Sequence, residues 1–394
     1  MNISATIRYI GVDDLDIDLF ESQYHVPEGM SYNSYLILDD KVALMDTADQ
    51  RKSAEWQQNL TEALCGRTVD YLVVHHMEPD HAANIAYAAK TYPEAKIILS
   101  AAALKMLPNF FPQADLTDRC QVVKEGDTLA LGTHALQFIA APMVHWPEVL
   151  MSYEQSEQVL FAADGFGKFG ALRHEQYNAD GTLADWACEA RRYYFNIVGK
   201  YGIQVQNVMK KAANLDIKTI APLHGPLLTG SDLAGALQLY TTWSKYEPET
   251  EGVFVAYASI HGGTKEAALK MVEILKQRGC PQVAVSDLTR DDMAEAIEDA
   301  FRYPTLVLCA ASYDAGLFPP MHDFLWHLQI KGYQRRRFGL VENGSWAPSA
   351  GRVMTEMVGQ MKDCEIVGPL VTIRSRMKDS DLPQLQALAD AVLS

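Results

Sequence analysis

Closely paired cysteines are absent from this sequence. Its 394 residues include six cysteines, and no two of them stand at the C-x-x-C spacing of a metal knuckle or a redox motif. Several lie in apolar runs, as Cys309 does in the stretch 306–309. Cysteines in such runs usually pack as small hydrophobic residues, so we expect free thiols and a reducing compartment.

Positive charge is also scarce. The chain has 34 Lys and Arg against 50 Asp and Glu, which gives a formal net charge of −16. An acidic surface repels phosphate backbones, and this argues against nucleic acid as a partner. The three consecutive arginines 335–337 are a candidate docking patch for a small protein, although a solvated turn before a strand is the favoured interpretation.

Long apolar runs are missing as well. No run reaches the roughly 18 residues that a membrane-spanning helix requires. The first six residues lack a basic segment followed by an apolar core, so the sequence predicts no secretory signal. We therefore expect a cytoplasmic protein that has no membrane partner.

Potential metal ligands, by contrast, are concentrated in one short stretch. His76, Glu78, Asp80 and His81 fall within six residues and directly follow the apolar run 71–74, which predicts a buried strand. Imidazole nitrogen and carboxylate oxygen without a thiolate suit iron, manganese or zinc. A polar turn with chance His and Asp residues is the less favoured interpretation.

Three later apolar runs also end in residues that can bind a metal. These residues are His145 after run 138–141, Asp164 after run 159–163 and His224 after run 219–222. Together with the first stretch they exceed the about four protein ligands of a single tetrahedral ion. They suit two ions that share a carboxylate, and Asp164, from the middle strand of the set, is the expected bridge.

The order of these ligands resembles a known pattern. A strand leading into His-x-His-x-Asp-His, with later His, Asp and His ligands, is similar to the metallo-β-lactamase fold, whose hydrolases usually carry His at the third position. This chain has Glu78 there, and a carboxylate makes the site harder and more anionic, which favours iron over zinc. The pattern His-x-Glu-x-Asp-His, followed by His, Asp and His, resembles the flavodiiron proteins.

This resemblance implies a role for each of the seven candidates. One iron would be held by His76, Glu78 and His145. The other iron would be held by Asp80, His81 and His224, with Asp164 bridging both.

The resemblance also indicates residues near the open face of the metal site. His25 and Tyr194 are similar to family residues in that position. Tyr193 is an equally good candidate for the tyrosine, and ordinary helix and loop packing explains these residues as well.

The last third of the chain has a different pattern. Residues 244–252 are polar, contain Pro and Gly, and predict a linker. From residue 253 to 341 strand-like runs alternate with helix-like runs, which predicts a parallel sheet with helices on both faces. This third resembles flavodoxin. Together with the resemblance of the first part, it implies an α/β protein with an N-terminal αββα metallo-β-lactamase-like domain over residues 1–247 and a flavodoxin-like doubly wound parallel sheet over residues 252–394.

Three loops at the carboxyl edge of that sheet carry residues suited to a flavin. Small residues in the first loop let backbone N–H groups converge on a phosphate, and aromatic residues in the other two can flank a planar ring. The resemblance to flavodoxin implies FMN binding by Ser259, His261, Gly262, Gly263 and Thr264 in the first loop, by Ser312, Tyr313, Asp314, Gly316 and Leu317 in the second, and by Asn343, Gly344, Ser345 and Trp346 in the third.

The flavodiiron resemblance implies an oxidoreductase with one FMN and two non-haem iron ions per chain. Electrons would pass from a small redox protein such as rubredoxin through FMN to the iron pair, which would reduce O2 to water, NO to N2O, or both. Members of the family are head-to-tail homodimers, and we expect a homodimer or a tetramer of such dimers. Two alternatives stay open: a di-zinc hydrolase with an appended flavodoxin domain, and an electron carrier with a vestigial metal domain.

Overall fold

The computed structural model describes residues 3–173 and 183–394. The chain folds into two compact units, each with its own core. The first consists of Met1–Tyr194 and Ile203–Tyr240, and the second of Phe195–Gly202 and Thr241–Ser394. The division thus passes through helix α7 (Gly230–Ser244), shortly before the expected linker, and the short segment Phe195–Gly202 belongs to the second unit.

Two six-stranded sheets form the centre of the first unit. In spatial order the first sheet contains β1 (Ile7–Tyr9), β6 (Tyr35–Leu38), β7 (Val42–Met45), β8 (Tyr71–Val73), β9 (Lys96–Leu99) and β10 (Cys120–Val122). The second contains β11 (Thr128–Ala130), β12 (Ala135–Ala140), β13 (Leu150–Glu154), β14 (Val159–Phe161), β15 (Thr219–Ala221) and β16 (Leu228–Thr229). Two short ribbons accompany them, β2 (Val12–Asp14) with β5 (Met30–Tyr32), and β3 (Leu19–Phe20) with β4 (Tyr24–His25).

The core of the first unit lies between these two sheets. Ile37, Val73 and Ile98 of the first sheet belong to the same buried cluster as Phe138 and Phe161 of the second. Alternate residues of a strand point to opposite faces, so each sheet contributes every second side chain to this cluster.

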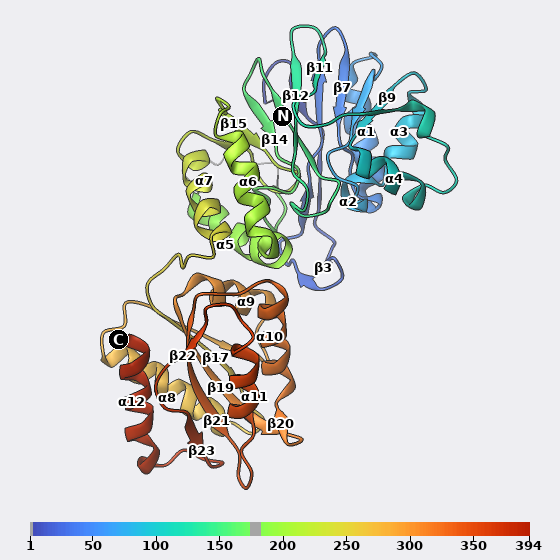
Figure 1. Ribbon diagram of the computed structural model, residues 1–394. Helices are drawn as coiled ribbons and strands as arrows, with labels where there is room; N and C mark the ends of the chain where they lie inside the picture. Colours follow the sequence, from blue (N-terminus) through green and yellow to red (C-terminus); the bar gives the residue numbers. More distant parts are fainter. Residues whose placement is uncertain (1–2, 174–182) are drawn as a thin grey trace. The chain divides into compact units, whose positions relative to one another are not determined.

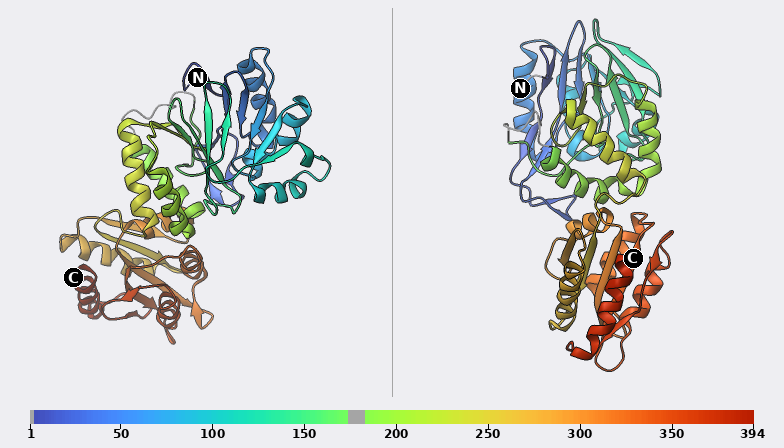
Figure 2. Two further views of the ribbon diagram at one scale, coloured as in Figure 1. Left: turned by 45° about the horizontal axis from the view of Figure 1, so that its top comes forward. Right: turned by 90° about the vertical axis from the view of Figure 1, so that its left-hand side faces the viewer.

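Helices cover the outer faces of both sheets. Figures 1 and 2 show α1 (Ser53–Leu64), α3 (Ile85–Thr91) and α4 (Ala101–Phe110) outside the first sheet, and α5 (Leu183–Tyr193), α6 (Gly202–Ala212) and α7 outside the second. The order of layers is therefore helix, sheet, sheet, helix, which confirms the expected αββα arrangement.

The second unit is a parallel sheet with the strand order β18-β17-β19-β21-β22. Its strands are β17 (Val253–Ala258), β18 (Val283–Asp287), β19 (Thr305–Tyr313), β21 (Arg337–Asn343) and β22 (Glu365–Ile366), with β20 (Gly316–Leu317) paired to β19 and β23 (Val371–Ile373) to β21. Its helices are α8 (Gly263–Gln277), α9 (Met293–Arg302), α10 (Pro319–Ile330), α11 (Ala350–Val358) and α12 (Leu382–Leu393).

Side chains of successive residues in β17 enter two different layers. Val255 belongs to the buried cluster that includes Leu275 of α8 and Leu388 of α12, whereas the ring of Phe254 lies 6.3 Å from that of Phe324 in α10. Both faces of the sheet are thus covered by helices, which explains the continuous apolar run of this strand. The structure confirms the parallel sheet with helices on both faces that the alternating runs predicted, and the flavodoxin-like fold that the resemblance implied.

The middle residue of the arginine triplet is not available to a docking partner. The Arg336 guanidinium is buried and donates hydrogen bonds to the carbonyl oxygens of Tyr303, Tyr246 and Phe301 at 2.7–2.9 Å. It therefore satisfies main-chain groups inside the second unit, and neither the docking patch nor the solvated turn describes it. Within the described ranges, no helix has both the length and the apolar character needed to cross a membrane.

Candidate metal centre and sheet-edge site

A buried chain of hydrogen bonds fixes the loop that leaves β8. Asp46 accepts a bond from the backbone N–H of His75 at 2.7 Å and contacts the Nδ1 atom of the same residue at 2.5 Å. The other ring nitrogen of His75 lies 2.8 Å from the Ser152 hydroxyl. All three side chains are buried, so they anchor the loop between the two sheets and are closed to a substrate. No motif in the sequence indicated this role for His75.

The four strand ends bring all seven predicted metal ligands together. His76 and Glu78 follow β8, and Asp80 and His81 lie in the short helix α2 (Pro79–Ala82). His145 follows β12, Asp164 follows β14 and His224 follows β15. Their ligand atoms form two groups, each with all atoms within 4.8 Å of one another: His76, Glu78, His145 and Asp164 in the first, and Asp80, His81 and His224 in the second.

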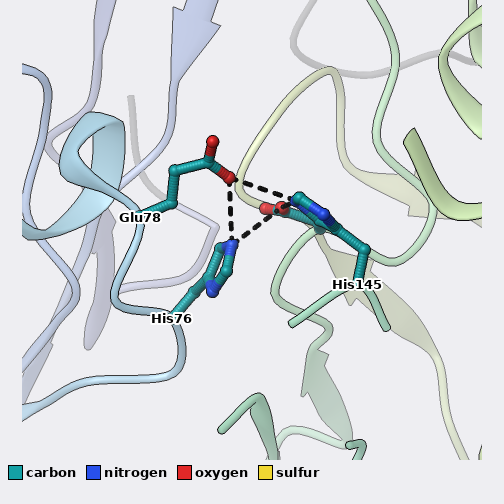
Figure 3. A group of neighbouring side chains, drawn as sticks. His76, Glu78 and His145 are labelled. Carbon is teal, nitrogen blue, oxygen red and sulfur yellow. Dashed lines mark hydrogen bonds and ion pairs between the residues drawn. The ribbon is translucent and has the colours of Figure 1, made fainter. Parts of the chain in front are cut away.

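We call the first group, without the shared Asp164, the first pocket. Its Glu78 Oε2 lies 3.2 Å from His76 Nε2 and 3.1 Å from His145 Nε2 (Figure 3). Asp164 Oδ2 lies 3.3 Å and 3.1 Å from the same two nitrogens. Two imidazole nitrogens and two carboxylate oxygens therefore face one point.

The second pocket consists of Asp80, His81 and His224. The Nε2 atoms of the two histidines are 3.0 Å apart, and Asp80 Oδ2 lies 3.3 Å from His81 Nε2 and 3.2 Å from His224 Nε2. Asp164 Oδ1 approaches His81 Nε2 to 3.4 Å. Asp164 thus directs one oxygen to each pocket, as a bridging ligand must.

The pockets have the properties of a cation site. Both oxygens of Asp80 and of Asp164 are buried and accept no hydrogen bond from residues 3–173 or 183–394. Buried carboxylate oxygens without partners are costly unless a cation or a proton balances them. Burial, together with the nearby carboxylates Glu78 and Asp164, raises the pKa of Asp80 to about 7. The donor set fits a metal pair of the hard or borderline kind, iron included.

The imidazoles and carboxylates of the first pocket shift one another's pKa. Burial alone would lower the pKa of His145, but Asp164 and Glu78 raise it to about 9. Burial would raise the pKa of Asp164, but the charge of His76 and the other imidazoles hold it well below its usual value. The pocket therefore favours positive charge beside its carboxylates, and a metal ion would supply that charge to neutral rings.

Two further groups hold the ligand histidines from behind. Glu148 Oε1 lies 2.7 Å from His76 Nδ1, and the carbonyl oxygen of Ser31 accepts a bond from His224 Nδ1 at 2.7 Å. Such partners fix which ring nitrogen faces the metal. Neither Glu148 nor Ser31 was predicted, because their proximity arises only from the tertiary fold.

The structure distinguishes the residues expected near the open face. Tyr193 is fully buried with its ring 5.6 Å from that of His224, whereas the ring of Tyr194 packs 5.0 Å from Tyr240. Tyr193, rather than Tyr194, is therefore in ring contact with a predicted ligand. His25 is exposed in β4, and its carbonyl oxygen accepts a hydrogen bond from Arg192.

Glu21 is a neighbour of the first pocket that sequence reasoning missed. It is an exposed residue in the turn between β3 and β4. Its carboxyl group interacts with that of Glu78 in the first pocket.

In the second unit, the loop before α8 has the form of a phosphate cradle. Gly262 has a φ of +87° and donates its N–H to the Ser259 hydroxyl at 3.1 Å. A Cβ on Gly263 would lie 2.0 Å from the carbonyl oxygen of Ser375, so only glycine fits there. His261 and the buried Thr264 complete the loop, and its backbone N–H groups lie at the N-terminus of α8, a ready position for an anion.

The other two predicted loops meet at the same sheet edge. The Ser312 hydroxyl accepts bonds from the backbone of Ser349 and Ala350, which ties the second loop to the start of α11. The aromatic residues Tyr313 and Trp346 are 46% and 89% exposed, so both rings are open to a ligand. The remaining predicted residues lie at the same strand ends: Asp314 follows β19, Gly316 and Leu317 form β20, Asn343 is the last residue of β21, and Gly344 and Ser345 follow it.

A fourth loop, after β23, joins this edge and was not predicted. Ser375 exchanges two hydrogen bonds with the Asn343 side chain, at 2.9 Å and 3.0 Å, and its hydroxyl lies 2.5 Å from that of Ser345. Its sequence, Arg374-Ser375-Arg376, has no motif that would have revealed this place.

Comparison with known proteins agrees with this geometry. The model of the ODP family beta lactamase matches residues 30–225. A nitric oxide reductase of Moorella thermoacetica is 28% identical over 98% of this chain and 96% of its own length. Two solved structures share the fold. The rubredoxin oxygen:oxidoreductase of Desulfovibrio gigas has a TM-score of 0.93 and 24% sequence identity, and the match covers 100% of this chain and 97% of that one. The flavodiiron protein of Giardia intestinalis has a TM-score of 0.91 and 21% sequence identity, and the match covers 99% of this chain and 95% of that one.

Both domains and the order of the ligands along the sequence agree with these comparisons. The chain has the fold of the solved flavodiiron protein, with a metallo-β-lactamase-like domain followed by a flavodoxin-like domain, and its residues 30–225 match the ODP family beta lactamase.

Proposed function

We propose that this protein is a flavodiiron oxidoreductase that reduces O2 to water, NO to N2O, or both. The observation that carries the proposal is Asp164, whose two buried oxygens face two separate groups of ligands. The relative from Moorella thermoacetica is a nitric oxide reductase, and the structural neighbour from Desulfovibrio gigas is a rubredoxin oxygen:oxidoreductase. Both substrates therefore belong in the proposal.

The residues of the first unit would hold two iron ions. His76, Glu78 and His145 would bind one iron, and Asp80, His81 and His224 the other, with Asp164 bridging the pair. Bound iron supplies one-electron redox chemistry toward a small diatomic ligand, which no side chain of the chain provides. The protein contributes the fixed spacing of the two pockets and their seclusion from water.

The loops of the second unit would hold FMN. Residues 259–264 would receive its phosphate, and Tyr313 and Trp346 would lie against its ring system. Flavin can take up and release electrons singly or in pairs, so it can connect an electron donor to iron. We propose rubredoxin or a similar small protein as that donor.

We also propose a cytoplasmic location and a head-to-tail homodimer, alone or paired as a tetramer. The six free cysteines support a reducing compartment. Light scattering on the holoprotein tests the assembly: a dimer or tetramer is expected, and an active monomer would contradict it.

The hydrolase alternative is disfavoured by Glu78. Its carboxylate lies 3.1–3.2 Å from two imidazole nitrogens of the first pocket, where the hydrolase pattern has a third imidazole. The added negative charge favours a metal that reaches the trivalent state, which zinc does not.

Gas consumption tests the proposed activity. Protein reduced through a surrogate rubredoxin system should consume O2, or NO under anaerobic conditions, in separate assays. The variant His81→Ala should lose this activity while its FMN stays reducible, because the substitution removes an imidazole only from the second pocket. Full activity in His81→Ala would show that the metal assignment is wrong.

A further inference from the structure

The back of the first pocket carries a buried carboxylate. Glu148 is 2% exposed, and its Oε1 lies 2.7 Å from His76 Nδ1 and accepts the backbone N–H of Met77 at 2.9 Å. Its Oε2 is buried and has no hydrogen-bond partner in the described parts of the chain. The carboxylate is therefore fixed by one contact to the His76 ring and one to the main chain, and within the described residues it forms no ion pair with a lysine or an arginine.

The back of the second pocket lacks such a charge. His224 Nδ1 donates to the neutral carbonyl oxygen of Ser31, which is itself fixed because the Ser31 hydroxyl accepts the backbone N–H of Gly225. The Nδ1 atom of His81 is buried and makes no hydrogen bond to any residue within 3–173 or 183–394. The two pockets thus differ in the hydrogen-bond partners of their histidine Nδ1 atoms: a carboxylate in the first and a backbone carbonyl in the second.

This difference has a chemical consequence. A carboxylate that accepts the Nδ1–H of an imidazole both fixes the tautomer and raises the basicity of the Nε2 that binds metal. A backbone carbonyl fixes the tautomer but adds no charge. A metal in the first pocket would therefore be subject to the negative charge of Glu78 directly and of Glu148 through His76. A metal in the second pocket would be subject to Asp80 alone, and the charge of Asp164 is common to both pockets.

We propose that Glu148 is a positioning residue that makes the two pockets electronically unequal, so that iron in the first pocket is oxidised at a lower potential than iron in the second. A more negative surrounding stabilises the ion of higher charge, which is the ferric state. The inference rests on the proposed function, because it requires iron in both pockets.

The test compares two matched variants. In Glu148→Gln the amide oxygen can still accept both bonds, so the shape of the pocket is kept and only the charge is lost. The control is Glu154→Gln, since Glu154 is an equally buried carboxylate beside a histidine, His134, that belongs to neither pocket. Iron content and a redox titration followed by EPR and Mössbauer spectroscopy are measured on holoprotein.

We expect Glu148→Gln to keep two irons and to change the ferric-to-ferrous ratio of the first pocket about tenfold, which equals 59 mV for one electron. The second pocket should change much less, and Glu154→Gln should match the wild type. No shift, an equal shift at both irons, or the same shift in the control would overturn the inference while the proposed function stands. Wild-type protein without iron would overturn both.

A second measurement decides the matter if Glu148→Gln does not fold. In wild-type protein loaded with zinc, which is diamagnetic, the Nδ1–H protons of His76 and His224 can be compared by 15N-resolved NMR. The bond to a carboxylate is stronger than one to a carbonyl, so the His76 proton should resonate further downfield. Equal shifts, or a more downfield His224 proton, would overturn the inference.

Discussion

At the scale of single residues, Glu78 separates this metal centre from the hydrolase pattern. It is the one ligand position at which a carboxylate replaces an imidazole, and its Oε2 contacts both histidines of the first pocket. The preference for iron over zinc should therefore depend on this side chain.

We predict that Glu78→His shifts metal selection toward zinc. When the protein is produced with equal iron and zinc, the iron-to-zinc ratio should fall about tenfold, the scale on which ligand surroundings change metal affinity. Metal analysis of the purified variant measures this. The exposed residue Glu125 offers a control, Glu125→His, and an unchanged ratio in Glu78→His would refute the role given to the carboxylate.

The ligands could be predicted from sequence, but their supports could not. Residues 76–81 are neighbours along the chain, and the later ligands each follow an apolar run, so pattern and order sufficed to name them. Glu148 and Ser31 stand 72 and 193 positions from the histidines they hold, and no local signal marks such pairs. The choice between Tyr193 and Tyr194 could not be made from the sequence either, since it depends on the helical phase at the end of α5.

At the scale of elements, the candidate ligands lie at the ends of strands and in the segments that follow them. The loop after β8 is fixed by the hydrogen bonds among Asp46, His75 and Ser152. Its ligands therefore keep their positions without metal, which reduces the cost of binding the ions.

Removal of the Ser152 hydroxyl should weaken this anchor. We predict that Ser152→Ala lowers the free energy of unfolding of the metal-free protein by about 1–3 kcal/mol, because a buried ring nitrogen of His75 loses its partner. Chemical denaturation measures the change. Ser156→Ala, in the exposed turn after the same strand, is the control and should cost clearly less. Equal losses in both variants would contradict the anchoring role.

The first loop of the flavodoxin-like sheet should be intolerant of any side chain. In Gly263→Ala the added Cβ would lie 2.0 Å from the Ser375 carbonyl oxygen, so the loop must shift away from its cradle shape. We expect FMN affinity to fall at least about tenfold, as measured by fluorescence titration. Gly359→Ala, at a helical φ of −63° after α11, should bind FMN normally. Wild-type affinity in Gly263→Ala would exclude this loop from the flavin site.

An acid-sensitive contact joins β2 to the turn before α1. Burial would raise the pKa of Asp14, but the hydrogen bond from Arg51 at 2.7 Å and the charge of Lys52 lower it below its usual value. A lowered pKa in the folded state contributes stability above the ordinary carboxyl pKa, and that contribution is lost as the pH falls. Asp14→Asn should therefore reduce stability at neutral pH, by about 1 kcal/mol, and progressively less in acid. A loss that does not depend on pH would contradict this assignment.

At the scale of the whole molecule, the chain combines two units with separate cores. The alternating runs after residue 253 were sufficient to predict the parallel sheet, because buried parallel strands and their helices leave a strong pattern. The apolar runs of the first unit predicted a mixed α/β domain, whereas its αββα layering came from the family resemblance. Two details could not be predicted, because they depend on tertiary contacts. The segment Phe195–Gly202 belongs to the second unit, and Arg336 is buried.

Separate cores predict separate responses to cofactors. In calorimetry of the apoprotein, FMN at about 100 times its Kd should stabilise the second unit by about 2.7 kcal/mol, and iron should stabilise the first. Two transitions that move independently are expected. A single transition that shifts with either cofactor would mean that the units unfold together.

The central claim is that Asp164 joins two iron pockets in one chain. Mössbauer spectroscopy of 57Fe-loaded, oxidised wild-type protein tests it most directly, with total iron measured on the same sample. We expect two ferric ions per chain that are magnetically coupled, because one carboxylate would bridge them. A single iron per chain, two uncoupled irons, or a centre that takes up zinc in preference to iron would contradict it.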